Sequence, residues 1–377
     1  MIYLDWAATS IPHEDIILSA CKKACVEFAN PSSKHFKGLA AKTLLENARN
    51  DISLCLNVKP ETIFFTSGGT ESDHLPLLSV MSAQRQCSIA ISNLEHSALS
   101  EQTKALERRG YKILTIPSDN KGFIRPEAVL KTVQEDTAFI SVMAVNNEIG
   151  SIQPIEEIGQ AVSEYCKGKK QIHFHTDAVQ AIGKIPFNLS SLPIHSAAFS
   201  GHKIGAMHGI GFLYLNKPIE PFIKGGGHEK GIRPGTENLA GAISLAECLK
   251  LHINKKQYEA ASKLMSFLIE ELTKTKGIEI VPKTRIQNPA SFSPWILQFS
   301  CSSLTGEVLV RCLSEKDICI STGSACSIKK NSRPILDAIK AEPKTKLNSV
   351  RVSIGYKTTI EELKEFILAL NSVIKEF

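Results

Sequence analysis

The sequence predicts an α/β protein: a large domain in which helices flank a mostly parallel central sheet, joined to a smaller α+β domain. The main observation is that apolar runs of strand length alternate with amphipathic stretches from residue 14 to about residue 250. This pattern is typical of parallel strands covered by helices on both faces. The pattern changes after Gly277, where short elements follow a link rich in Pro and Asn, and 377 residues are enough for two domains. We expect the large domain at 13–255 and the small domain from 1–12 and 256–377.

The hydrophobic period indicates each element in turn. After Gly235 a single long helical pattern runs toward residue 276, and Gly277 is suited to end it. In the large domain we expect helices at 14–29, 35–56, 70–83, 97–109, 126–134 and 154–166, and strands at 62–66, 88–92, 111–116, 138–145, 171–176, 194–199 and 210–215. In the small domain we expect strands at 278–281, 295–300, 318–321 and 349–354, and helices at 304–314 and 360–376.

The composition argues against several classes of protein. Lys and Arg exceed Asp and Glu by six, 44 against 38, which is too little over this length to indicate direct nucleic-acid binding. No apolar stretch approaches the length of a transmembrane helix, and the N-terminus lacks the pattern of a signal peptide. The 10 cysteines contain no CxxC pair or short-spaced framework, as expected of reduced thiols. We therefore expect a cytoplasmic protein with no membrane partner.

Lys203 is the first candidate catalytic residue. It lies in Ser200–Lys203, directly after an apolar run at 194–199 that predicts a buried strand. Open α/β sheets bind ligands beyond the carboxyl ends of their strands. An apolar setting there lowers the pKa of a lysine and makes its amine nucleophilic, which is the chemistry of a Schiff-base lysine. The alternative is a solvated surface charge, which is the commoner fate of a lysine at such a position.

A glycine-rich loop, Thr66–Glu71, lies between a predicted strand and a predicted helix. Gly68 and Gly69 allow the backbone to approach an anion, and the N-terminus of the following helix offers N–H groups and a positive dipole, which suits a phosphate. The loop is neither a Walker loop nor a GxGxxG motif. An equally supported interpretation is a tight strand–helix turn in which Thr70 caps the helix.

Asp177 ends the predicted strand at 171–176 with a carboxylate. An anion there can hold a cofactor ring nitrogen protonated, which makes the ring an electron sink. His173 and His175 alternate with Asp177 on one face of the strand. Two interpretations of this pattern remain open: a metal site, or the more common case of side chains that hydrogen-bond within the fold.

His96 and the Asn146-Asn147 pair also follow predicted strands. A histidine at such a place can stack on a planar cofactor and carry protons, or it can simply cap the next helix. The amide of Asn147 can meet a ring hydroxyl or a substrate. Because the carboxyl ends of parallel strands meet at one edge of a sheet, we expect these groups to converge on one binding site.

Seven motifs occur along the chain in the order seen in cysteine desulfurases: SGGTES, EHSA, VNNEIG, HTDAVQ, SGHK, GGGHEKGIRPGTEN and STGSAC. The chain therefore resembles that family over nearly its whole length, from Leu4-Asp5 to the last helix. The family consists of pyridoxal-phosphate enzymes of the class V aminotransferase type with the fold type I architecture. The resemblance thus implies that fold, pyridoxal 5'-phosphate as the cofactor, no metal, and a homodimer.

The resemblance also implies a role for each matching residue. Lys203 corresponds to the Schiff-base lysine that moves the Cα proton, and His96 to the histidine that stacks on the ring and transfers protons. Asp177 corresponds to the partner of the pyridine nitrogen, Gln180 to the partner of the ring hydroxyl, and Asn147 to an asparagine near the ring and the substrate.

A second set of residues matches the phosphate and substrate sites. Arg351 resembles the arginine that clamps the substrate carboxylate, a role suited to its planar, bidentate guanidinium. The implied phosphate ligands are Gly69, Thr70, Ser200, His202 and, lent by the neighbouring subunit, Thr236.

Cys326 is the candidate nucleophile. It lies in Ser321–Ser327, where small residues precede it, and a polar loop with Lys329 and Lys330 follows. A nearby positive charge raises the thiolate fraction of a cysteine. The match to STGSAC implies that this thiol attacks the substrate sulfur and carries it as a persulfide. The loop resembles that of the long-cysteine-loop group, although it is shorter before Pro334.

The implied function is the conversion of L-cysteine to L-alanine, with transfer of the sulfur to an acceptor protein, either an iron–sulfur cluster scaffold or a tRNA-thiolation enzyme. The nearest alternative is a selenocysteine lyase or another enzyme of the class V aminotransferase fold. An alternative of another kind is a non-catalytic sulfur carrier or scaffold. A nucleotide-binding protein built on Gly68 and Gly69 is a further one, weakened by the missing lysine.

Two stretches depart from the usual family pattern. Asp73-His74 follows SGGTES where two asparagines are common, and Ala206-Met207-His208 replaces a more usual Gly-Pro-Lys. We expect neither stretch to contact a residue with an assigned role, although either could reshape the mouth of the pocket.

Overall fold

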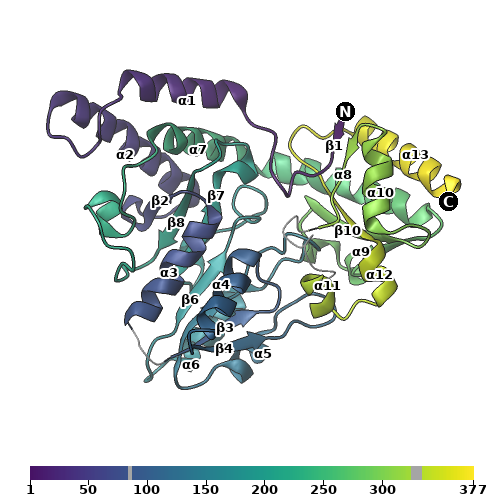
Figure 1. The fold of residues 1–377 in the computed structure, drawn as a ribbon, viewed down its shortest axis with the longest axis horizontal. Coiled ribbons are helices and arrows are strands. Elements are labelled where there is room, and N and C mark those ends of the chain that lie inside the picture. The colour runs from purple at the N-terminus through teal and green to yellow at the C-terminus, as the bar shows by residue number, and fades with distance from the viewer. Residues whose placement is uncertain (84–86, 324–332) are drawn as a thin grey trace.

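The computed structural model describes residues 1–83, 87–323 and 333–377. Its main feature is a seven-stranded sheet in the order β2-β8-β7-β6-β5-β3-β4 (Figure 1). The neighbours from β4 to β7 pair in parallel, whereas β8 runs antiparallel to both β2 and β7. The predicted mostly parallel sheet is therefore confirmed. The strands are β2 (Ile63–Thr66), β3 (Ser88–Ser92), β4 (Lys112–Ile116), β5 (Thr137–Ser141), β6 (His173–Asp177), β7 (Ser196–Ser200) and β8 (Gly211–Leu215).

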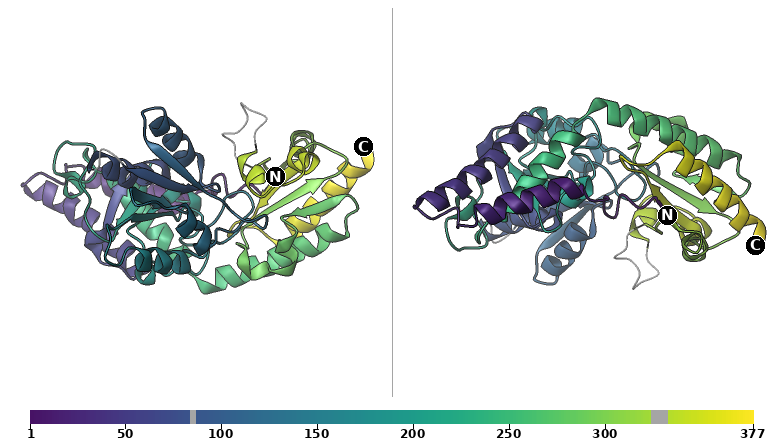
Figure 2. Two further views of the ribbon diagram at one scale, coloured as in Figure 1. Left: turned by 90° about the horizontal axis from the view of Figure 1, so that it is seen from below. Right: turned by 90° about the horizontal axis from the view of Figure 1, so that it is seen from above.

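Helices cover both faces of this sheet (Figure 2). Side chains alternate along β3: Ile89 and Ile91 pack with residues of α3 and α4, whereas Ala90 packs in the cluster that contains α2, α6 and α7. Such alternation places apolar side chains against helices on each side, as a buried parallel sheet requires. The helices are α1 (Glu14–Val26), α2 (Phe36–Leu56), α3 (Gly69–Ala83), α4 (Ser97–Glu107), α5 (Pro126–Thr132), α6 (Ile155–Tyr165) and α7 (Leu239–His252).

The C-terminal third forms a second core with the first residues of the chain. A three-stranded antiparallel sheet has the order β12-β10-β9, and β1 pairs in parallel with β11. Figure 1 shows the N-terminus lying beside these late elements. They are β1 (Ile2–Tyr3), α8 (Lys255–Lys274), β9 (Ile278–Val281), α9 (Thr284–Gln287), β10 (Ile296–Cys301), α10 (Gly306–Ser314), β11 (Ile318–Cys319), α11 (Pro334–Ala338), α12 (Pro343–Asn348), β12 (Ser349–Ser353) and α13 (Ile360–Glu376).

The long helix expected after Gly235 is wrong: two helices, α7 and α8, occupy this region. Asn254 begins the second of them, because its side chain accepts a hydrogen bond from the backbone N–H of Lys256 and so caps the helix. Apolar period alone does not reveal this break, since both helices keep an apolar face toward a core. In the described part of the chain, no helix combines the length and the apolar character needed to cross a membrane.

A buried ion pair ties the glycine-rich segment around η4 (His228–Gly231) to the large sheet. The Arg49 guanidinium donates two hydrogen bonds to the Glu229 carboxylate, at 2.8 and 2.7 Å, and a third to the backbone oxygen of Ile63 at 2.6 Å. Glu229 also accepts a hydrogen bond from the backbone N–H of Phe65 at 2.7 Å. Both charges are thus paired and hydrogen-bonded, as burial requires.

Replacing Glu229 with Gln should lower the free energy of unfolding by about 3 kcal/mol, because the Arg49 charge loses its buried counter-charge and keeps only the more exposed Glu46, 3.1 Å from its Nε. Urea unfolding followed by circular dichroism measures this loss. The matched control is Glu220→Gln: its pair with Lys224 is exposed (66% and 63%), so the cost should stay below about 1 kcal/mol. Equal losses in the two variants would contradict the role given to Glu229.

Candidate active site

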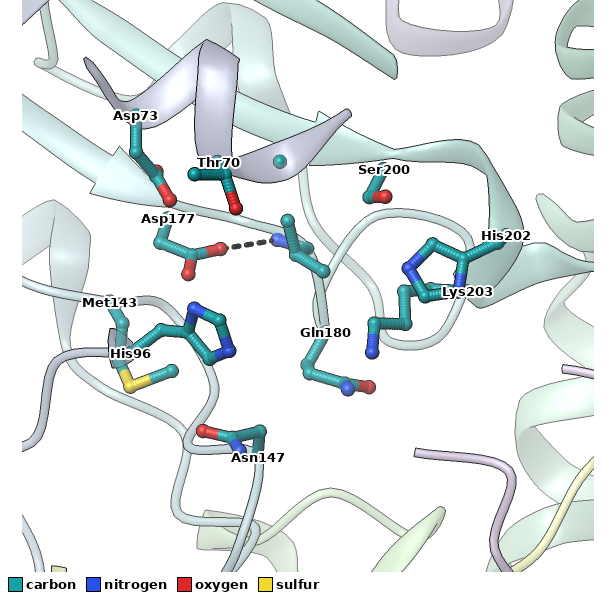
Figure 3. Close-up of a pocket in the computed structure, with 12 residues that line it drawn as sticks. Thr70, Asp73, His96, Met143, Asn147, Asp177, Gln180, Ser200, His202 and Lys203 are labelled. Atoms are coloured by element: carbon teal, nitrogen blue, oxygen red, sulfur yellow. Dashed lines mark hydrogen bonds between the residues drawn. The ribbon is translucent and has the colours of Figure 1, made fainter. Parts of the chain in front are cut away.

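A pocket opens where strands of the large sheet end (Figure 3). It encloses about 510 Å³ including its mouth, a size typical of small-molecule sites. Because β3, β5, β6 and β7 are parallel, the residues that follow them gather at one edge. Nine of the predicted site residues line this pocket: Gly69, Thr70, His96, Asn147, Asp177, Gln180, Ser200, His202 and Lys203. The other lining residues are Asp73, Met143 and Val179.

The Lys203 side chain points into the pocket from the turn η3 (Gly201–Ile204), directly after β7 (Figure 3). Its Nζ donates hydrogen bonds to the backbone oxygens of Ala7 at 2.9 Å and Ala8 at 2.7 Å. Gly205 ends the turn with φ at 74°, a conformation that glycine adopts without steric cost. The two hydrogen bonds to Ala7 and Ala8 show that the backbone of the N-terminal segment holds the Lys203 amine.

Asp177 and His96 face the same pocket from the ends of β6 and the loop after β3 (Figure 3). Asp177 is buried, and its Oδ1 accepts a hydrogen bond from the backbone N–H of Val179 at 2.9 Å. Burial raises the pKa of Asp177, while His96 and Lys203 oppose this shift. A cationic ring nitrogen beside this carboxylate would likewise oppose the rise in the pKa of Asp177.

His96 caps the helix that follows it and also lines the pocket. Its Nδ1 accepts a hydrogen bond from the backbone N–H of Ala98 at 3.1 Å, so the ring caps α4. Its ring also lines the pocket, and burial lowers the pKa of His96. A neutral imidazole that accepts at Nδ1 carries its proton on Nε2. This ring is therefore fixed in one tautomer while its remaining edge faces the pocket.

One corner of the pocket is formed by the N-terminus of α3. The first backbone hydrogen bond of α3 runs from Ser72 N–H to the oxygen of Gly68, so the N–H groups before Ser72 have no partner in the helical ladder. Thr70 lies inside the first turn of α3, which begins at Gly69, so the prediction that Thr70 is the capping residue is wrong. A Cβ on Gly69 would lie 2.9 Å from Val179 Cγ2, so the loop has room only for glycine unless Val179 moves.

Asp73 is a pocket residue that the sequence did not identify. It is buried, and its Oδ1 lies 3.1 Å from His175 Nε2. The expectation that this stretch contacts no site residue is therefore wrong, since Asp73 lines the same wall as Asp177. Helical spacing is the signal that could have found it: Asp73 lies three and four residues after Thr70 and Gly69, on the same face of α3.

The histidines of β6 hydrogen-bond within the fold. His175 Nδ1 and His173 Nε2 each lie 2.7 Å from Ser196 Oγ, and His175 Nε2 pairs with Asp73. Burial lowers the pKa of His175 to about 3, and burial raises that of Asp73, further raised by Asp177. The internal hydrogen-bonding interpretation of this strand therefore describes the structure.

The second departure from the family pattern also contacts a predicted site residue. The ring of His208 lies 5.3 Å from that of His202, and both rings contact Thr9 Oγ1, at 3.2 and 3.0 Å. The expectation for this stretch is therefore wrong as well. The loop after η3 folds back on the turn, because β7 and β8 are joined without a crossover helix.

Arg351 lies beside the pocket, outside the set of residues that line it. From β12 its Nη1 donates to the backbone oxygen of Asn147 at 2.9 Å, and its Nη2 donates to Asp5 Oδ1 at 2.7 Å. The side chain is buried, and in the described part of the chain its Nε has no hydrogen-bond partner. A guanidinium with an unused buried N–H can accept one more anionic ligand.

The two remaining predicted residues are Thr236 and Cys326. Thr236 is exposed and does not line the pocket. Cys326 lies outside the described residues, between Gly323 and Arg333. At the described ends of that segment, Arg333 donates a hydrogen bond to the backbone oxygen of Thr322. Arg333 also donates a hydrogen bond to the backbone oxygen of Lys346 at 3.2 Å.

Comparison with known proteins identifies the family. Residues 2–366 match the family model of the class-V aminotransferases. The chain belongs to the class-V aminotransferase family. This membership confirms the resemblance drawn from the seven motifs, and the α/β fold with a mostly parallel central sheet is that of the family.

Relatives of this class-V aminotransferase carry desulfurase names. A protein described as "NifS/IcsS protein homolog" from Lactobacillus delbrueckii subsp. bulgaricus is 36% identical over 100% of this chain and 98% of its own length. A "Cysteine desulfurase IscS" from Dictyoglomus turgidum is 35% identical over 100% of this chain and 95% of its own. A solved structure described as "NifS-like protein" covers 100% of both chains with a TM-score of 0.91 at 32% identity.

We expect the buried Glu95, next to His96, to make the stability of this class-V aminotransferase depend on pH. Its carboxyl is buried and accepts hydrogen bonds from Ser92 Oγ at 2.6 Å, Met143 N–H at 2.8 Å and Ser141 Oγ at 3.0 Å. Burial raises the pKa of Glu95 from 4.5 to about 7. The folded state therefore binds this proton more tightly than the unfolded state, and stability is lost as the pH rises from 4.5 through about 7.

A Glu95→Gln variant should not show this loss. The free energy of unfolding of the wild type, measured relative to the variant, should fall by about 3 kcal/mol across that pH range. Urea unfolding of both proteins at several pH values measures the difference, in which all shared titrations cancel. A difference that stays constant with pH would refute the raised pKa.

Proposed function

We propose that this protein is a pyridoxal-phosphate-dependent cysteine desulfurase. The observation that carries the proposal is the convergence of an amine, a buried carboxyl, an imidazole and a helix N-terminus in one pocket, from Lys203, Asp177, His96 and α3. The names of the relatives supply the substrate class. In the proposed reaction, L-cysteine and the Cys326 thiol give L-alanine and a Cys326 persulfide, so that all atoms balance.

The pocket fits pyridoxal 5'-phosphate by the chemistry of its donors. The corner at the N-terminus of α3, with Gly69, Thr70, Ser200 and His202, would hold the phosphate. Asp177 would pair with the ring nitrogen, since the carboxyl is buried and would be stabilised by a cationic partner. When bound, the cofactor supplies an electron sink for the charge left on the substrate Cα.

The residues of the chain then have distinct tasks. Lys203 would hold the cofactor aldehyde and move the Cα proton at its Nζ, which backbone carbonyl groups hold in this structure. His96 would stack on the ring, and it holds a proton on Nε2. Arg351 would bind the substrate carboxylate, and its buried Nε, which has no hydrogen-bond partner among the described residues, supports this task. Asn147, whose backbone oxygen accepts a hydrogen bond from Arg351, would contact the ring and the substrate.

The partners belong to the proposal too. We propose that the persulfide sulfur passes to an acceptor protein, an iron–sulfur cluster scaffold or a tRNA-thiolation enzyme, and that the protein acts as a homodimer. The exposed position of Thr236 supports its service to the phosphate site of a second subunit. We also propose action in the cytoplasm, which is supported by the absence of disulfides among the nine cysteines of the described residues.

A Lys203→Ala variant should lose the visible absorbance of the bound cofactor, at roughly 400 nm from the conjugated imine chemistry. The measurement is the absorbance spectrum of each protein after incubation with pyridoxal 5'-phosphate and removal of the excess. Lys217→Ala, which removes an exposed lysine just after β8, is the control and should keep the band. A band retained in the Lys203 variant would exclude Lys203 as the binding amine.

A Cys326→Ser variant should keep this absorbance band and still bind L-cysteine, yet release no sulfide in the presence of dithiothreitol, because no thiol can accept the sulfur. Sulfide and alanine are assayed together, so that desulfuration is distinguished from transamination. The control is Cys25→Ser, which removes an exposed thiol of α1. Normal sulfide release by the Cys326 variant would remove this residue from the mechanism.

A further inference from the structure

Lys184 contacts the pocket residue Gln180 from behind. Its Nζ donates a hydrogen bond to Gln180 Oε1 at 2.7 Å, and Gln180 Nε2 in turn donates to the backbone oxygen of Ala7 at 3.0 Å. The same Ala7 oxygen accepts a hydrogen bond from Lys203 Nζ at 2.9 Å. Lys184 is thus linked to the amine of the proposed active site by a chain of three hydrogen bonds, through Gln180 and Ala7, although it does not line the pocket itself.

The position of Lys184 is fixed by its own backbone. Trp295 Nε1 donates a hydrogen bond to the Lys184 backbone oxygen. Gly183 precedes it with φ at 75°, and a Cβ there would lie 3.2 Å from His252 Cβ and 3.3 Å from Ile204 Cγ2. The backbone of the turn is therefore packed from two sides. From this backbone the Lys184 side chain extends to Gln180, where its ammonium group donates the hydrogen bond to Oε1.

A donor-only neighbour decides how a glutamine amide is oriented. The two ends of an amide have the same shape but opposite hydrogen-bonding character, and the network around them selects one orientation. A protonated lysine can only donate, so it requires Gln180 Oε1 on its side. The amide NH₂ then faces Ala7 and the pocket. One of its two N–H groups bonds the Ala7 oxygen, which leaves the other for a ligand.

We propose that Lys184 is a positioning residue: by its hydrogen bond to Gln180 Oε1, it makes Gln180 present an N–H, and not an oxygen, to the ring oxygen of the bound cofactor. The inference rests on the proposed function, which pairs Gln180 with that ring oxygen. An N–H donor stabilises a ring oxygen in its anionic form, whereas an amide oxygen in its place would favour the protonated hydroxyl.

The donor role requires that Lys184 carry its proton. Burial, followed by the positive charges of Lys203 and Arg351, lowers the pKa of Lys184 to about 7. Lys184 is therefore an obligate donor only below about pH 7, and an anionic ligand in this basic region would favour the protonated form. The experiment is carried out below that pH. The hydrogen bond from Lys184 to Gln180 is the contact that connects the amine to the pocket.

The test is the absorbance of the cofactor-loaded protein at one pH. The anionic and neutral states of the ring oxygen absorb at different wavelengths, so the ratio of the two bands reports the donor. Lys184→Met should shift this ratio about tenfold toward the neutral state, the effect of losing one hydrogen bond to a charged group. Lys184→Arg retains a donor and should restore the wild-type ratio. Lys263→Met, at an exposed position on α8, should leave it unchanged.

A double-mutant cycle shows whether Lys184 acts through Gln180. In a Gln180→Ala background the Lys184→Met change should shift the ratio no further, because the amide that it orients is gone. A shift of equal size in that background would overturn the proposal. So would an unchanged ratio in Lys184→Met, provided that thermal unfolding of the cofactor-free variant matches the wild type.

Two further outcomes separate the possible failures. If Lys184→Met does not fold, Lys184→Gln serves instead. The amide of this glutamine can donate or accept a hydrogen bond, so we expect an intermediate shift of the band ratio. An unchanged band ratio in Lys184→Gln would overturn the proposal. A wild-type protein without any visible cofactor band would overturn the proposed function and this inference with it. If the wild type shows a normal band and the variant without the donor, Lys184→Met or Lys184→Gln, has the same band ratio, this inference alone is overturned.

Discussion

The site depends on one electrostatic constraint, the burial of the Asp177 carboxyl at the end of β6. A buried carboxylate is costly unless hydrogen bonds and nearby cations compensate for the lost hydration. Here the N–H of Val179 contributes a hydrogen bond, and His96 and Lys203 oppose the rise in pKa that burial causes. A cationic ring placed between these groups would relieve the remaining cost, so the pocket is suited to a heterocycle with a basic nitrogen.

The charge of Asp177 also affects two other buried carboxyls, Asp73 and Glu95, and favours their protonated forms. Asp73 and Glu95 are buried close enough to Asp177 for its charge to raise the pKa of each. Their hydrogen bonds, to His175 and to Ser92, lie within the wall of the pocket. Carboxyls crowded in this way cannot all ionise. The arrangement leaves Asp177, the one flanked by His96 and Lys203, as the acid best able to carry charge.

The N-terminal segment connects the two parts of the molecule at this site. Asp5 pairs with Arg351 of the small sheet, while the oxygens of Ala7 and Ala8 hold Lys203 of the large one. Ser10 also donates a hydrogen bond to the backbone oxygen of Lys203 at 2.7 Å. A few residues at the start of the chain thus fix the amine and the guanidinium relative to each other, and Gln180 and Lys184 join the same network through Ala7.

Local patterns in the sequence determined the order of helices and strands, because apolar periodicity and glycine turns are properties of neighbouring residues. They also determined which polar groups follow parallel strands, so Lys203, Asp177 and His96 were identifiable as candidates before any coordinates. The tertiary structure alone decided which residues contact these groups from elsewhere in the chain: Asp73 from the first turn of α3, Ala7 and Ala8 from the N-terminus, and Lys184 from beneath Gln180. These contacts are set by how separate elements pack and by which charges share a buried space. Apolar periodicity reports only on residues that are neighbours in the sequence. It therefore could not predict these contacts, whose partners come together only when separate elements pack.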